Sequence, residues 1–198
     1  SPMEILSATV HAGTIFDLDV GDLDGDGDMD IVLATALSIS VMENTGGGQF
    51  LPMVSFYNDP NGSPFRVKLI DLDGDKSLDV IASVDRASNG FQNQNVVLLN
   101  LSTHPFSHAT PMYFSTGNLI SSFDGGDLDN DKDLDVITIS QSGNLEFFKN
   151  AGNGVLSSLD TIQSPKGNIV SVKLANFNNR LDDLKFSISG GKDSALFE

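Results

Sequence analysis

The sequence predicts an all-β fold, a β-propeller of four four-stranded blades, on the strength of a repeated loop and its spacing. One nine-residue acidic loop occurs as DLDGDGDMD, DLDGDKSLD and DLDNDKDLD, starting at Asp22, Asp71 and Asp127. A degenerate copy starts at Asn176, so the spacings are 49, 56 and 49 residues, and a period near 50 indicates a repeat architecture. Each repeat has room for four short strands and contains no stretch with the period of a helix.

The strands are expected in the same order in every repeat. An alternating apolar segment precedes the acidic loop, and a β-branched second strand follows it, reading IVLAT, VIASV or VITIS. A third strand ends in Asn44, Asn100 or Asn150, and a turn then leads to the fourth strand. We expect the fourth strands near residues 53–57, 110–115 and 159–163.

The phase of the repeats predicts how the propeller closes. We expect one domain over residues 1–198, with repeats at about 3–49, 50–105, 106–155 and 156–198. Because segment 3–10 resembles a fourth strand and the chain ends in a third strand, the N-terminal strand would complete the last blade and remove exposed sheet edges. The alternative is a segment of a larger propeller, for example one of seven blades.

Charges alternate on the expected innermost strands. The residues three positions before each loop are Asp19, Lys68, Asp124 and Lys173. In a closed ring of four blades each of them would have an oppositely charged neighbour on both sides. The pattern therefore predicts ion pairs near the axis of the ring, although four residues could also alternate by chance.

The acidic loops have the composition of calcium sites. Carboxylates at alternate positions of a short loop repel one another unless a cation lies among them, and a set of oxygen ligands favours calcium. Counting the first Asp as position 1, the side chains of positions 1, 3, 5 and 9 and the carbonyl group of position 7 are the expected ligands. The candidate residues are Asp22, Asp24, Asp26, Asp28 and Asp30 in the first loop, Asp71, Asp73, Asp75, Ser77 and Asp79 in the second, and Asp127, Asp129, Asp131, Asp133 and Asp135 in the third.

Two further features limit the kind of site. An EF-hand needs Glu at position 12, where this chain has Leu33, Ala82 and Thr138, and a strand rather than a helix follows each loop. The fourth copy has Arg180 at position 5 and Leu184 at position 9, so we expect no metal there. We expect the three Ca²⁺ ions to be structural, because no general base recurs beside the loops.

The composition excludes several classes of protein. The formal charge is −16, with 27 acidic and 11 basic residues, so no basic patch is available to bind nucleic acid. The loops contain 14 of the acidic residues, which makes the acidity mainly a property of the expected metal sites. No apolar run is long enough to predict a membrane span, and the absence of Cys excludes a disulfide framework.

The loops, the strand order and the N-x-G-x-G-x-F element at residues 44–50 together resemble the FG-GAP and VCBS repeat families. Blades of this type, loaded with calcium, also occur in integrin alpha-subunit propellers. The literal Phe-Gly and Gly-Ala-Pro signature is absent, so the resemblance is closer to the VCBS type, and Lys76 and Lys132 stand where the family usually has Gly. The resemblance implies a secreted, extracellular or cell-surface module.

A partner, protein or glycan, is expected on the face opposite the calcium loops, where the second-to-third and fourth-to-first strand connections lie. The longest of these connections spans residues 85–95 and is flanked by residues 58–64. Its candidate ligand contacts are Arg86, Phe91, Gln92 and Asn93. A tolerated surface insertion is the alternative explanation of this long connection.

The sequence favours a non-catalytic module for adhesion or protein binding over an enzyme. His11, His104 and His108 share no equivalent position in the repeats. The alternatives are a lectin-like propeller that binds glycans and an accessory domain of a secreted polysaccharide-acting enzyme. Trp is absent and Tyr57 and Tyr113 are the only tyrosines, so few side chains could stack on a sugar ring.

Overall fold

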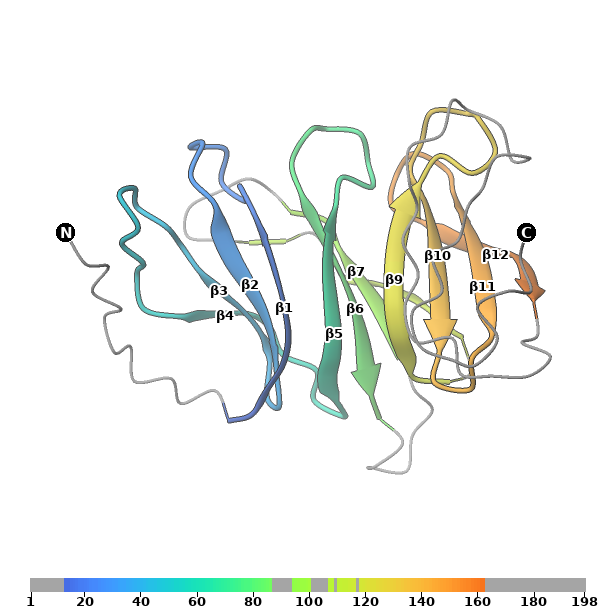
Figure 1. Cartoon of the computed structure of the whole chain (residues 1–198), viewed down its shortest axis with the longest axis horizontal. Coiled ribbons are helices and arrows are strands. Elements are labelled where there is room, and N and C mark those ends of the chain that lie inside the picture. Colours follow the sequence, from blue (N-terminus) through green and yellow to red (C-terminus); the bar gives the residue numbers. More distant parts are fainter. Residues whose placement is uncertain (1–12, 87–93, 101–106, 109, 117, 163–198) are drawn as a thin grey trace, which may run out of the picture.

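The computed structural model describes residues 13–86, 94–100, 107–108, 110–116 and 118–162. Over this range the chain forms three four-stranded antiparallel sheets that follow one another along the molecule (Figure 1). In this described part we find no helix that could cross a lipid bilayer. The first sheet contains β1 (Ile15–Gly21), β2 (Asp30–Thr35), β3 (Ile39–Met42) and β4 (Val54–Tyr57). The second contains β5 (Ser63–Ile70), β6 (Asp79–Asp85), β7 (Gln94–Leu98) and β8 (Met112–Phe114), and the third contains β9 (Ile120–Gly126), β10 (Asp135–Ser140), β11 (Leu145–Asn150) and β12 (Leu156–Ile162).

The order of strands within each sheet is the order in the chain, as in propeller blades. The predicted fourth strands are found at β4 and β8, within two residues of the expected bounds. The strand expected at 159–163 begins earlier, because Leu156 pairs with Asn150 at the end of β11 and extends the ladder. The segments expected to form a fourth blade, including Lys173, residues 176–184 and residues 3–10, lie outside the described residues.

The sheets pack face to face and bury the second strand of each. Residues of β6 and β10 are buried on both faces, with the single exception of Asp85, which explains why these strands are runs of apolar and small residues rather than alternating ones. One core lies between the first and second sheets, with Val32 and Val80 at its centre, and another lies between the second and third. In the second core the rings of Phe114 and Phe148 meet edge to face, 5.0 Å apart.

The first strands of the sheets are neighbours, because β5 contacts both β1 and β9. The predicted charge pairing is confirmed for one pair, because Lys68 Nζ lies 3.4 Å from Asp19 Oδ2. The same oxygen of Asp19 accepts a hydrogen bond from the backbone N–H of Leu69 at 2.9 Å. A cavity of about 450 Å³ lies between these strands, lined by residues 16–19, 66–68 and 121–123.

Candidate metal sites in the acidic loops

All three acidic loops connect the first and second strands of a sheet, and they lie at the upper end of the molecule in Figure 1. Each loop is folded by hydrogen bonds from its own backbone. The carboxylate of position 1 accepts bonds from the N–H groups of positions 4 and 6, and the carboxylate of position 5 accepts one from the N–H of position 7. These nine distances are 2.7 to 3.1 Å. Asp favours such turns because its side chain reaches its own backbone.

Positions 4 and 6 have left-handed backbone conformations in every loop. Glycine occupies both in the first loop, where Gly25 and Gly27 have φ of 81° and 95°. Lys76 and Lys132 occupy position 6 of the later loops with φ of 76° and 81°. A side chain with a Cβ atom adopts this conformation at a cost, so the later loops keep the shared shape with some strain.

The Asp at position 9 is buried in every loop and acts as an anchor. Asp30, Asp79 and Asp135 are at most 1% exposed. In each, Oδ2 accepts a hydrogen bond from the N–H of position 2, and Oδ1 accepts one from the N–H of the Asn that ends or follows the third strand, all at 2.8 to 2.9 Å. Burial raises the pKa of all three carboxyl groups, that of Asp79 to about 6, although the backbone donors act in the opposite direction.

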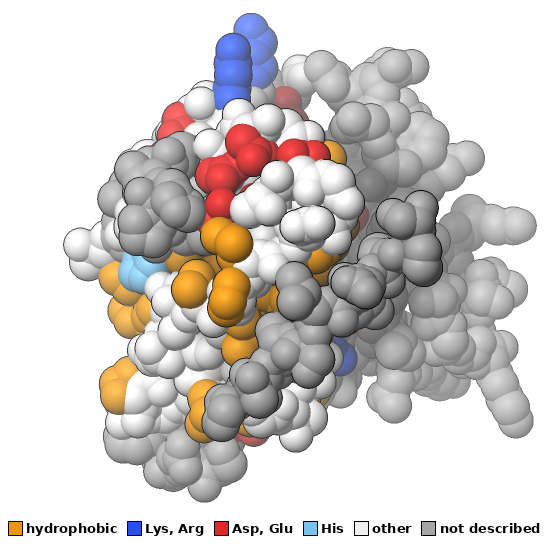
Figure 2. Space-filling view, turned by 90° about the vertical axis from the view of Figure 1, so that its left-hand side faces the viewer, with side chains coloured by type: hydrophobic (Ala, Val, Ile, Leu, Met, Phe, Trp, Pro, Cys, Tyr) orange, Lys and Arg blue, Asp and Glu red, His pale blue; other side chains and the backbone are white. Residues whose placement is uncertain are grey.

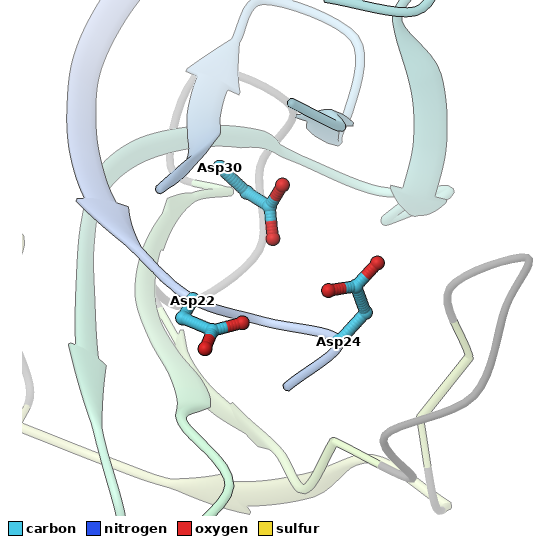
Figure 3. Close-up of side chains that lie close together, drawn as sticks. All are labelled: Asp22, Asp24 and Asp30. Carbon is cyan, nitrogen blue, oxygen red and sulfur yellow. The ribbon is translucent and has the colours of Figure 1, made fainter. Parts of the chain in front are cut away.

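The carboxylates of positions 1, 3 and 9 converge in each loop. In the first loop Asp22, Asp24 and Asp30 each contribute an oxygen within 4.8 Å of the others, and Figure 3 shows their carboxylates turned toward a common space. The same cluster forms at Asp71, Asp73 and Asp79, and at Asp127, Asp129 and Asp135. Such a set of hard oxygen ligands suits Ca²⁺. The residues present therefore fit the predicted ion.

The predicted ligands at positions 5 and 7 do not belong to the carboxylate clusters that positions 1, 3 and 9 form. Among the described residues, Asp26, Asp75 and Asp131 do not join the three-residue clusters, and one oxygen of each already accepts the N–H of position 7. At position 7, Asp28, Ser77 and Asp133 contact the loop through these N–H groups, and the role of their carbonyl groups stays a prediction.

A lysine outside the third loop contacts its carboxylates, and the sequence analysis did not predict this contact. Lys149, on β11, forms an ion pair with Asp129 and another with Asp131, its Nζ lying 2.9 Å from Asp131 Oδ2. These carboxylates raise the pKa of Lys149, and the hydrogen bond from the ammonium group lowers the pKa of Asp131. The available signal was positional, because Lys149 immediately precedes Asn150, just as Glu43 precedes Asn44 and Leu99 precedes Asn100.

Side-chain amides connect the first and second acidic loops to the next sheet. Asn100 donates a hydrogen bond from Nδ2 to the carbonyl oxygen of Leu23, at position 2 of the preceding loop, at 2.6 Å. Asn150 makes the equivalent bond to Leu72, also at 2.6 Å. The first and second loops are thus fixed from two directions, by the anchor of their own sheet and by the following sheet.

The opposite end of the molecule holds Arg86, which directly follows β6. Its Nε donates to Asp59 Oδ2 at 3.0 Å, and its guanidinium group also contacts Gln94 and lies 5.7 Å from the ring centroid of Tyr113. The Asp59 side chain is fully buried and also accepts a bond from Tyr57 at 3.3 Å. Arg86 is therefore part of an internal network. Phe91, Gln92 and Asn93, the other predicted ligand contacts, lie outside the described residues.

Comparisons with known proteins agree with the pattern of loops. A sequence model described as FG-GAP-like repeat matches residues 22–82 and 127–180, which include all three acidic loops. No curated protein matches the sequence. One similar solved structure is described as the structural basis of specific recognition of non-reducing terminal N-acetylglucosamine by an Agrocybe aegerita lectin. It shares 18% sequence identity with this chain, with a TM-score of 0.48. The matched region covers 74% of this chain and 37% of that chain. Another is a humanized mutant of the Chaetomium thermophilum Polycomb Repressive Complex 2 bound to the inhibitor GSK126, with 8% identity, a TM-score of 0.43 and coverage of 68% and 28%. The chain thus spans well under half the length of these two.

Proposed function

Because the chain belongs to the FG-GAP-like repeat family, we propose that it is a non-catalytic β-propeller binding module whose blades are stabilised by three Ca²⁺ ions. One observation carries the proposal. The same arrangement of three convergent carboxylates recurs at the same point of three successive sheets, and the N–H groups of positions 2, 4, 6 and 7 donate to the same carboxylates in all three loops. The carboxylates of positions 1, 3 and 9 would hold each ion, and position 5, the position 7 carbonyl and water would complete the roughly six to eight ligands that calcium accepts.

The proposed role of the ions is structural. Each ion would neutralise carboxylates that otherwise repel one another and would fix the connection between the first and second strands of a sheet. A ligand present at about 100 times its dissociation constant adds roughly 2.7 kcal/mol to the free energy of unfolding. The position of His108 supports a non-catalytic role, since its ring packs against the ring of Phe56, 4.9 Å away, rather than beside an acidic loop.

Calorimetric titration with CaCl₂ tests this proposal directly. We expect three ions per chain and a lower melting temperature when EDTA replaces calcium. Titration with MgCl₂ serves as the comparison and should give weaker binding, since Mg²⁺ keeps several of its waters. A chain that binds no calcium, or one whose melting temperature EDTA leaves unchanged, would contradict the proposal.

We further propose that the three sheets are blades of a four-bladed ring, with residues 163–198 and 3–10 as the fourth blade. Leu18 and Val20 on β1 are 56% and 53% exposed, whereas Val67 and Leu69 at the equivalent positions of β5 are buried against the first sheet. Figure 2 views the molecule from the side of its first sheet and shows hydrophobic side chains exposed there, below acidic ones. A fourth blade would cover this face.

Asn44 gives independent support for the closed ring. It makes the bond to its own loop, from Nδ2 to the carbonyl oxygen of Met29 at 3.2 Å. Its counterparts Asn100 and Asn150 also reach the loop of the preceding sheet, but Asn44 makes no such bond to any described residue. In a closed ring its acceptor would lie on the blade that precedes the first sheet. Light scattering and small-angle X-ray scattering test the closure, and we expect a compact monomer of 21.1 kDa.

We place the partner site at the end of the molecule opposite the acidic loops and the protein outside the cell. Calcium modules of the extracellular space bind with dissociation constants of roughly 10⁻⁴ to 10⁻³ M, and we expect that range here. Submicromolar affinity for calcium would contradict the location outside the cell.

One observation favours the alternative of a glycan-binding module or of an accessory domain of a polysaccharide-acting enzyme. Tyr113 is 48% exposed and lies beside Arg86. Saturable binding of one sugar on a glycan array in calcium would favour that alternative over a protein partner.

A further inference from the structure

We propose that Lys149 is a built-in cation of the third acidic loop, which competes with calcium and makes this loop the weakest of the three metal sites. The inference rests on the proposed function, because it concerns the order in which the three loops fill. It assigns a role to a residue outside the acidic repeat, and it predicts that loops with nearly the same sequence differ in affinity.

The geometry places the ammonium group among the expected metal ligands. Lys149 Nζ lies 2.9 Å from Asp131 Oδ2 and also forms an ion pair with Asp129 Oδ2. Asp129 is itself one of the three convergent carboxylates of this loop, with Asp127 and Asp135. Its other oxygen, Oδ1, is buried and finds no hydrogen-bond partner among the described residues. The ammonium group therefore occupies one oxygen of a convergent carboxylate, while the other oxygen of that carboxylate stays unsatisfied.

The backbone fixes Lys149 at this place. The next residue, Asn150, donates its N–H to Asp135 Oδ1 at 2.9 Å, so the lysine enters the loop from a position set by the buried anchor. Asn44 and Asn100 make the same bond to Asp30 and Asp79. Glu43, Leu99 and Lys149 therefore occupy one equivalent backbone position beside three equivalent loops.

The residues at this position differ in charge, and so do the loops. The first loop has five Asp and no basic residue, with acidic Glu43 at the neighbouring position. The second has four Asp and Lys76, and the third has five Asp and Lys132, which Lys149 brings to the same formal charge of −3. Formal charge separates the first loop from the others, and the direct contact of Lys149 separates the second from the third. We expect calcium affinity to fall from the first loop to the third.

An ion entering the third loop must compete with a cation that already forms two ion pairs there, whereas no equivalent lysine precedes Asn44 or Asn100. The same lysine offsets part of the carboxylate repulsion when calcium is scarce, so it favours the folded loop in the metal-free protein. Removing it should therefore have opposite effects on the two states. The variant should be less stable than the wild type in EDTA and should gain more stability on adding calcium.

Site-resolved NMR provides the test, because each loop contains a backbone N–H that reports on its own site. The N–H groups of position 4, in Gly25, Gly74 and Asn130, donate to the position 1 carboxylate at 2.8, 2.8 and 2.7 Å. A ¹⁵N-labelled full chain is titrated with CaCl₂, and the midpoint of each signal is followed. In the wild type we expect the midpoint of Gly25 at the lowest calcium concentration and that of Asn130 at the highest.

Two exchanges between the loops carry the test further. Lys149→Leu, which installs the residue of the second sheet, should lower the Asn130 midpoint about tenfold and leave Gly25 and Gly74 unchanged, as expected for two partly exposed ion pairs. Glu43→Lys should raise the Gly25 midpoint. Because the Lys149 side chain is 40% exposed, its replacement should not prevent folding, and Lys149→Met provides a second variant of similar length.

Lys132→Gln is the matched control, since it removes the same charge from the same loop without removing the Lys149 ion pairs. We expect it to shift the Asn130 midpoint by less than about threefold, since charges at the exposed surface are screened. Equal shifts for Lys132→Gln and Lys149→Leu would overturn the inference, and so would an unchanged Asn130 midpoint in Lys149→Leu. If no wild-type signal responds to calcium, the proposed function itself fails, which is a distinguishable result.

Discussion

Each acidic loop has a buried half, at position 9, and an exposed half, at position 5, and Asp occupies both. The Asp residues of the two halves have different structural roles. In the second loop the carboxylate of Asp79 is buried and spends both oxygens on backbone donors, from Leu72 and Asn100. The carboxylate of Asp75 lies at the exposed side of the loop and accepts one N–H, from Ser77. The buried half thus belongs to the scaffold even without metal, whereas the exposed half would contribute to stability mainly through the proposed ion. The comparison shows that an Asp in a repeated acidic motif can act mainly as a hydrogen-bond acceptor for the backbone rather than as a metal ligand.

The largest expected effect comes from removing the buried anchor. Asp79→Ala leaves the N–H groups of Leu72 and Asn100 without acceptors, and unsatisfied buried donors cost roughly 1 to 3 kcal/mol each. We expect a loss of about 3 kcal/mol in the free energy of unfolding, measured by urea denaturation in EDTA. Asp75→Ala, under the same conditions, should change it by less than about 0.5 kcal/mol. Equal losses for the two variants would break the distinction between the loop halves.

The exposed carboxylate of Asp75 should matter for stability only when calcium is present. In saturating calcium, Asp75→Ala should lose most of the contribution of one ion, which is roughly 2.7 kcal/mol at about 100 times the dissociation constant. Calorimetry should then count two ions per chain instead of three. If Asp75→Ala retains three ions with unchanged affinity, the position 5 carboxylate is not a ligand.

The bonds between sheets come next in size. Asn100→Ala removes the donor to the carbonyl of Leu23 and should cost about 1 to 2 kcal/mol in urea denaturation. Asn44→Ala is the matched variant. In a closed ring it should cost a similar amount, because Asn44 would also bridge to a neighbouring blade, whereas in an open array its loss should be markedly smaller.

The smallest expected effect concerns strain in the exposed half. Lys76 has a φ of 76°, where glycine is free of the steric cost that other residues bear. Lys76→Gly should therefore raise the free energy of unfolding by about 0.5 kcal/mol, after the greater freedom of glycine in the unfolded chain is subtracted. Lys68→Gly, on a strand, is a suitable contrast and should be destabilising. A loss of stability in Lys76→Gly would show that the lysine side chain makes contacts that outweigh its strained backbone.

Sequence reasoning predicted the features that follow from the repeat period. The period places each acidic loop between a first and a second strand, and it brings positions 1, 3 and 9 together, as in Asp22, Asp24 and Asp30. It could not predict how position 5 divides its oxygens, because one oxygen of Asp26 accepts the N–H of Asp28 in a local turn.

The ion pair of Lys68 with Asp19 was predicted from the sequence, but two other contacts between distant segments were not. The contact of Lys149 with Asp129 depends on the path of a long side chain, and the position of Lys149 before Asn150 indicates only that it lies near the loop. Arg86 was singled out because it opens a long connection, yet it pairs with buried Asp59 on the segment between β4 and β5. A repeat shows that sheets are equivalent, but it does not say which atoms of neighbouring sheets meet.

The bond from Asn100 to Leu23 also bears on how the protein is made. These residues are 77 positions apart, and Asn150 and Leu72 are 78 apart, so the carbonyl groups of the first and second loops meet their donors only after the next sheet has been synthesised. As the chain leaves the ribosome, a newly formed sheet is thus incomplete until its successor emerges. Translation would finish the loops one after another, in order from the N-terminus, and a stalled chain would expose the last of them unfinished.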